Sequence, residues 1–131
     1  MKKTDRFERI VAAIDAVCRG EEENYARKKS SLASARQHAD KLSALGASSD
    51  GAAMLLPEIW CARLSKTFAE IARLDGEVAV QARQLRLARA RREKAEDRLR
   101  DERIKERIAR EAKNVEEHLE IALQSGRIRL R

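Results

Sequence analysis

The side chains best suited to chemistry are two cysteines, Cys18 and Cys61, and two histidines, His38 and His118. Thiolates and imidazoles bind Zn²⁺ when they come in closely spaced pairs, and a cysteine acts as a nucleophile when a base lies within reach. Neither arrangement occurs, because the four residues are far apart in the chain. A glycine-rich phosphate loop is also missing. We therefore expect no catalytic residue, no metal site and no cofactor.

A basic run is the second feature that could bind a ligand. From Arg83 to Arg110 there are twelve Lys or Arg against six Asp or Glu, and the whole chain carries a net charge of +7. Such a run attracts phosphates or an acidic protein surface. Against nucleic acid, Arg83, Arg86 and Arg89 step by three and wind around a helix, and no aromatic residue follows Phe68 for base stacking. A solvated helix face, an acidic protein partner and nucleic acid all stay open as interpretations.

Composition points to long helices. The chain is 39% charged and only 3% aromatic, which is too polar for an ordinary compact core, and its 131 residues correspond to one domain. No apolar run approaches 18 residues, and the start, Met1-Lys2-Lys3-Thr4, does not resemble a secretory signal. We expect no membrane span and a cytoplasmic location.

Apolar residues recur at alternating steps of four and three in two long segments. A period of 3.5 kept over several heptads makes a narrow stripe that another helix covers, which is typical of a coiled-coil seam. The predicted seam consists of Phe7, Val11, Ile14, Tyr25, Leu32, Leu42, Leu64, Ile71, Leu74, Val78, Leu85 and Leu99.

The element boundaries follow from capping and turn residues. Thr4 is a plausible N-cap, the small and polar residues 46–51 indicate a reversal, and Pro57 suits the first turn of a helix. The pattern predicts an all-α fold, a two-helix antiparallel coiled-coil hairpin with a longer second helix, in a single elongated domain. The predicted elements are a helix over about 5–45, a turn over 46–56, a helix over about 57–124 and a basic tail over 125–131.

Folding the two stripes against each other gives a register. With Leu42 opposite Trp60, large residues meet small or medium ones, as close packing requires, and Glu21 meets Gln81 in one polar layer. Because every layer is completed within one chain, we expect a monomer. The same register separates Cys18 from Cys61 too widely for an intramolecular disulfide.

Beyond Leu99 the apolar pattern changes phase, since Ile104 follows at a step of five where three or four was due. We expect the hairpin to end there, and residues 100–125 to project beyond the N-terminus as a lone helix. An apolar stripe without a partner, in basic surroundings, suits an acidic protein surface. The candidate partner-binding residues of this segment are Arg100, Arg103, Ile104, Arg107, Ile108, Val115 and Leu119.

The region around the turn is more apolar than a turn requires. Its side chains either fold over the end of the coil or form a contact patch for a partner, and the sequence leaves both alternatives open. The candidate residues of this second patch are Met54, Leu55, Leu56, Ile59, Trp60 and Phe68.

A two-helix coil of this length, with one Trp after the turn in segment 58–68 and a charged C-terminal part ending in segment 110–117, resembles the FliJ/YscO family. The resemblance covers nearly the whole chain. It implies a non-enzymatic stalk of a type III export apparatus, flagellar or virulence-associated. Such a stalk sits in a hexameric export ATPase and also contacts the export gate and export chaperones, which implies a peripheral position at the inner membrane. Two alternatives remain: a basic coil that binds nucleic acid or the ribosome, and a plain scaffold coil.

Overall fold

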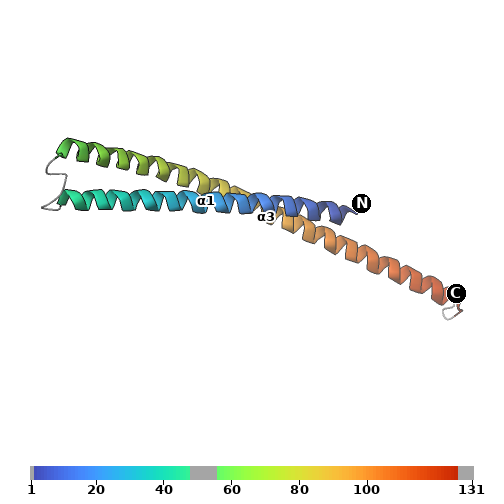
Figure 1. Ribbon diagram of the computed structural model, residues 1–131. Helices are drawn as coiled ribbons and strands as arrows, with labels where there is room; N and C mark the ends of the chain where they lie inside the picture. The colour runs from blue at the N-terminus through green and yellow to red at the C-terminus, as the bar shows by residue number, and fades with distance from the viewer. Residues whose placement is uncertain (1, 48–55, 127–131) are drawn as a thin grey trace. The chain divides into compact units, whose positions relative to one another are not determined.

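The computed structural model describes residues 2–47 and 56–126. Over these ranges the chain forms two helices, α1 (Lys3–Ala47) and α3 (Pro57–Gln124), and no strand (Figure 1). The predicted all-α hairpin with a longer second helix is thereby confirmed. Neither helix is long and apolar enough to cross a membrane. Residues 48–55, which include most of the predicted turn, and the tail residues 127–131 lie outside the described ranges.

Helix α1 begins slightly earlier than the sequence suggests. The Lys2 carbonyl accepts hydrogen bonds from the N–H groups of Asp5 (3.1 Å) and Arg6 (3.4 Å), so Lys2 is the N-cap. The prediction of Thr4 as N-cap was wrong. Thr4 is instead 8% exposed inside the first turn, and its hydroxyl hydrogen-bonds Glu106 of α3. The hydroxyl that would have capped the helix therefore forms a contact between the two helices.

Both ends of α3 follow local rules. The Trp60 N–H donates to the Leu56 carbonyl at 3.1 Å, which places Pro57 at the first helical position, where its missing N–H costs nothing. At the other end the Ser125 N–H donates to the Ile121 carbonyl at 2.9 Å, and Gly126 has φ of 69°. A glycine in the left-handed region just after the last turn is a common helix stop.

The chain divides into two compact units, one of Met1–Ile14 with Arg91–Arg131 and the other of Asp15–Ala90. Each consists of a segment of α1 running antiparallel to a segment of α3. Within the described ranges every predicted seam residue is buried or half-buried, from Phe7 to Leu99. The prediction of a single domain stays a prediction, because both helices continue through both units.

In the unit 15–90 two inter-helix hydrogen bonds define the register. The Trp60 Nε1–H donates to the Leu42 carbonyl at 2.7 Å, and the Gln81 side-chain amide donates to the Glu21 carboxylate and, at 3.4 Å, to the Glu21 carbonyl. Gln81 is only 3% exposed, so this polar layer lies inside the apolar seam. Both pairings are those of the predicted register. A buried polar layer penalises slipped alignments, in which its amide would lose these partners.

In the unit built from segments 2–14 and 91–126, α1 and α3 stay paired beyond Leu99. Lys3 forms an ion pair with Glu102 at 3.9 Å and Lys2 with Glu106 at 3.6 Å. The prediction that pairing ends at the phase change was wrong. Glu102 and Glu106 continue the steps of three and four from Leu99, but as carboxylates whose stems cover the seam while their heads meet lysines. The predicted seam was based on apolar residues only, so it did not include these two glutamates as seam positions.

Candidate protein-binding surfaces

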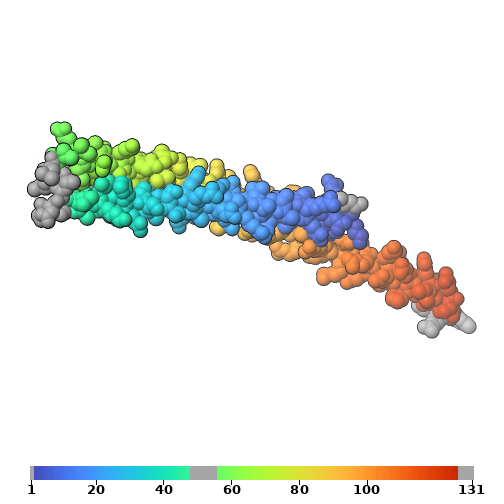
Figure 2. All heavy atoms as spheres, in the orientation of Figure 1, coloured from blue at the N-terminus to red at the C-terminus, as the bar shows by residue number. Residues whose placement is uncertain are grey.

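The C-terminal part of α3 has no intrachain partner. From residue 107 to residue 124 every position is exposed except the half-buried Ala122, and Figure 2 shows this orange-to-red stretch without α1 beside it. We call residues 107–124 the arm. At 1.5 Å per residue it is about 27 Å long, shorter than the segment that the sequence predicted, because the pairing extends to Glu106.

An apolar stripe runs along α3 into the arm, on the face turned away from α1. At about 100° per residue its members lie between about 140° and 200° around the helix from the buried Leu99. The stripe accounts for the phase change in the sequence, because the apolar pattern moves from the inner face of α3 to the outer one. The members of this arm stripe are Ile104, Ile108, Val115 and Leu119, all exposed.

The arm is not basic. Residues 107–124 contain three Lys or Arg and four Glu, so the positive charge of this region belongs to the paired segment before the arm. Of the three predicted partner-binding arginines, Arg100 pairs with Asp97 at 2.6 Å and Arg103 with Glu8 of α1 at 3.3 Å. The structure therefore places both in the paired segment. It leaves the arm stripe as the feature of the arm that needs a partner.

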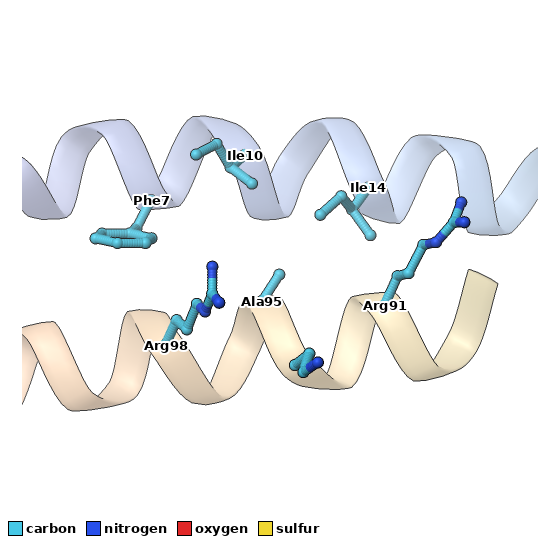
Figure 3. A pocket seen from close by; sticks show the side chains of 7 residues that line it. Phe7, Ile10, Ile14, Arg91, Ala95 and Arg98 are labelled. Atoms are coloured by element: carbon cyan, nitrogen blue, oxygen red, sulfur yellow. The ribbon is translucent and has the colours of Figure 1, made fainter. Parts of the chain in front are cut away.

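A groove with a basic rim lies between the two helices of the same unit (Figure 3). Phe7 and Ile14 point from α1 toward α3, Ile10 lines the groove between them on α1, and Ala95 points toward α1 from the other side. The cations of the rim stand on α3 at steps of three and four, so they form one row along the helix. We call this the basic groove, and its rim consists of Arg91, Lys94 and Arg98.

The basic groove was not predicted, although its parts were visible in the sequence. The spacing of Arg91, Lys94 and Arg98 indicates one helix face, and the predicted register places Phe7 opposite Ala95. Only the hairpin brings that aromatic ring to the cationic row. Along α3 itself no aromatic residue accompanies the basic run, but the fold places Phe7 of α1 beside it.

At the other end, the predicted tip residues divide into two groups. Leu56, Ile59 and Phe68 are exposed, whereas Trp60 is half-buried and hydrogen-bonded to the Leu42 carbonyl. Its ring lies against Gly46, where an added Cβ would come within 2.1 Å of Cζ2. Trp60 therefore belongs to the contact between helices. Met54 and Leu55 lie outside the described residues.

Ion-paired surface groups in both units have shifted pKa values. The Thr4 hydroxyl, followed by Lys2 and Arg110, lowers the pKa of Glu106. A hydrogen bond from Arg73 lowers the pKa of Glu70 and raises that of the arginine. These contacts stabilise charged forms that already predominate at neutral pH, so none supplies an acid or base for catalysis.

The chemistry-bearing residues are dispersed. Both cysteines are free thiols, Cys18 buried and Cys61 exposed. Among the described residues no three of His, Cys, Asp and Glu come together in a way that could hold a metal ion. Comparison of the chain with protein-family models, with curated proteins and with solved structures finds no significant match.

Proposed function

We propose that this chain is a non-enzymatic adaptor that binds a protein partner through the arm stripe. The observation that carries the proposal is the exposure of Ile104, Ile108, Val115 and Leu119 on the face of α3 that is turned away from α1. Burying an aliphatic side chain of this size stabilises a complex by about 1.5–3 kcal/mol. Several such side chains in one row supply enough free energy for specific recognition, once the cost of association is subtracted.

The resemblance of the sequence to export-apparatus stalks suggests the partner, a hexameric export ATPase of a type III system. In this proposal the arm enters the ring and the chain acts in the cytoplasm at the inner membrane, with the export gate and export chaperones as further partners. The arm supports it as a single exposed helix, since its stripe is open to contact with the wall of a ring channel. The recognition would rest on apolar contact and not on basic charge, because residues 107–124 contain more Glu than Lys and Arg.

Two substitutions of matched exposure test the role of the stripe. Ile108, 59% exposed, lies on the arm stripe, whereas Ile121, 62% exposed, lies on the opposite side of the arm, about 40° around the helix from Leu99. Ile108→Asp should weaken binding to the purified ATPase ring at least about tenfold, by loss of one buried aliphatic side chain. Ile121→Asp should change it less than about twofold.

Truncation after Glu106 is the companion experiment. It keeps the ion pairs and hydrogen bonds described above between α1 and α3 and removes the arm, so the hairpin should retain its helicity while losing both ring binding and any stimulation of ATP hydrolysis. Full ring binding by the truncated chain would contradict the proposal. So would equal effects of the two aspartate substitutions, since these would show that the stripe has no special role.

The alternatives from the sequence are a coil that binds nucleic acid or the ribosome, and a plain scaffold coil. Part of the basic run is engaged within the chain, since Arg89 contacts Glu22 at 3.6 Å. Phosphate binding would show as an affinity for mixed-sequence RNA or DNA that falls steeply as salt rises. Binding of that kind, at physiological salt and without ring binding, would place this alternative first.

A further inference from the structure

The basic groove is open and has the chemistry of a docking surface. It holds a volume of about 210 Å³. Its floor is made of the apolar side chains of Phe7, Ile10 and Ile14, and Ile10 is 46% exposed in spite of its position beside α3. A ligand that fits must therefore present apolar side chains to the floor and negative charge to the rim.

The rim is uncompensated, unlike the basic residues around it. Within the described part of this unit, Arg91, Lys94 and Arg98 have no ion pair. Neighbouring cations do have partners, such as Arg100 with Asp97 and Lys105 with Glu102. Three unpaired cations in one row raise the local potential, and an anionic partner would lower it.

The end of the arm has the complementary composition. Residues 114–124 contain three Glu and no Lys or Arg, and five of the other positions are apolar: Val115, Leu119, Ile121, Ala122 and Leu123. Among the described residues none of these glutamates forms an ion pair. This segment cannot reach the groove of its own chain, because α3 continues as one helix from Pro57 to Gln124 and includes both. A second copy can supply it.

We propose that two copies of the chain associate antiparallel, so that the arm of each lies in the basic groove of the other. The lengths agree: the arm is about 27 Å long, and the paired segment 91–106 that bears the groove is about 24 Å long. A two-fold axis near residue 107 superimposes one on the other. The contact is isologous, so each dimer forms the same interface twice.

The register brings opposite charges together. A two-fold axis at residue 107 places Glu120 of one copy beside Lys94 of the other, and Glu116 beside Arg98. Each acid pair and each base pair is spaced by four residues, so both contacts form in one alignment. Arg98 and Glu116 also share one angular position around α3, about 260° from Leu99, and a two-fold axis brings equal angular positions face to face.

The same alignment covers apolar surface. Leu119 and Leu123 lie on the side of the arm that faces the groove. The axis at residue 107 brings them beside residues 95 and 91 of the other copy, where Phe7 and Ile10 receive them. The seam between α1 and α3 stays intact, so the internal pairing that predicts a stable single chain is compatible with the dimer. The dimer and a partner bound to the arm stripe would compete for the same side chains.

Nucleic acid fits the groove less well. A phosphate backbone would satisfy the three cations but leave the aliphatic floor uncovered, and one aromatic ring offers a single stacking position. An amphipathic acidic helix satisfies floor and rim together. The arm of a second copy is such a helix, and its Glu116 and Glu120 have the same four-residue spacing as Arg98 and Lys94.

Charge reversal tests the proposal with the full chain in the absence of any ATPase, so its failure is distinguishable from failure of the proposed function. At low salt the wild-type chain should give twice the 14.9 kDa of one chain in sedimentation equilibrium at high concentration. Lys94→Glu with Arg98→Glu should raise the dimer Kd at least about tenfold, and Glu116→Lys with Glu120→Lys should do the same. All four sites are exposed, so circular dichroism at 222 nm should be unchanged.

Restoration is the decisive measurement. A chain with all four reversals has an acidic groove and a basic arm end, and should dimerise as the wild type does. Mixing the two double variants should give a heterodimer, since each groove then meets the opposite charge. Each of these results supports the proposal. A wild-type chain that stays monomeric at about 1 mM in low salt overturns it, as does a dimer that the reversals leave unchanged. Monomers whose groove binds an acidic amphipathic peptide or single-stranded RNA also overturn it.

Discussion

Gly46 and Trp60 provide the sharpest test of how the helices are held together near the turn. Gly46 lies in the last turn of α1, and a Cβ added there would meet the Trp60 ring at 2.1 Å from Cζ2 and 2.7 Å from Cε2. Gly20 and Gly76 also lie inside helices, but a Cβ at either would meet nothing within 4 Å. The same substitution, glycine to alanine, should therefore have opposite effects at the two kinds of site.

The magnitudes follow from three contributions. Alanine is favoured over glycine in a helix interior by about 1 kcal/mol, so Gly20→Ala and Gly76→Ala should raise the free energy of unfolding by about that amount. At Gly46 the ring must move, which costs about 1–3 kcal/mol for overpacking. It also breaks the bond from Nε1–H to the Leu42 carbonyl, worth about 1 kcal/mol. The net result for Gly46→Ala is a loss of about 1–3 kcal/mol.

Urea unfolding measures these differences, with circular dichroism for helicity and the fluorescence of the one Trp for the contact itself. A second background isolates the cause: in Trp60→Ala the space above Gly46 is empty, so Gly46→Ala should become stabilising there. If Gly46→Ala stabilises the wild-type chain as much as Gly76→Ala does, Trp60 does not pack on α1 as described.

Two further predictions concern single side chains. The exposed thiol of Cys61 should react with a thiol reagent within seconds to minutes, whereas that of Cys18, which is 0% exposed, should react only as the helices open, so native protein should show one fast thiol and denatured protein two. The lowered pKa of Glu106 means that its contribution to stability is fully present above the ordinary value of 4.5 and is lost as pH falls through the lower value of the folded state. The protection factor of the amides near Thr4, which compares their exchange with the intrinsic rate at the same pH, should therefore fall on acidification below pH 4.5. Thr4→Val should reduce this pH dependence, because the hydroxyl of Thr4 is the main cause of the shift in the pKa of Glu106.

Much of the fold was determined locally, in the sequence itself. Apolar residues at steps of three and four specify both the helical state and the face that is buried, because a seam of period 3.5 can be covered only by another helix. Pro57 and Gly126 delimit α3 by backbone preferences that act without tertiary contacts. The layer of Glu21 and Gln81 was predictable for the same reason, since the register follows once the two stripes are aligned.

The tertiary structure decided the roles of the polar side chains, because apolar periodicity does not indicate them. Pairing continues to Glu106 because the carboxylates of Glu102 and Glu106 occupy the seam and form ion pairs with Lys3 and Lys2. The apolar pattern ends at Leu99 and therefore does not include these positions. Thr4 is a seam residue and not a cap, because a partner on α3 takes its hydroxyl. Polar side chains can be buried, capping or solvated in the same sequence context, and only the neighbouring helix determines which of these occurs.

The candidate surfaces show the same division. The arm stripe was predicted from the phase change as part of a lone helix beyond the end of the hairpin, whereas the structure places its first member, Ile104, on the outer face of a segment that is still paired. The basic groove depended on the hairpin, because Phe7 and Arg98 are ninety-one positions apart in the chain and become neighbours only when the helices fold together. Local preferences therefore determined the helices and their buried faces, while the pairing of distant segments decided which cations remain without a partner.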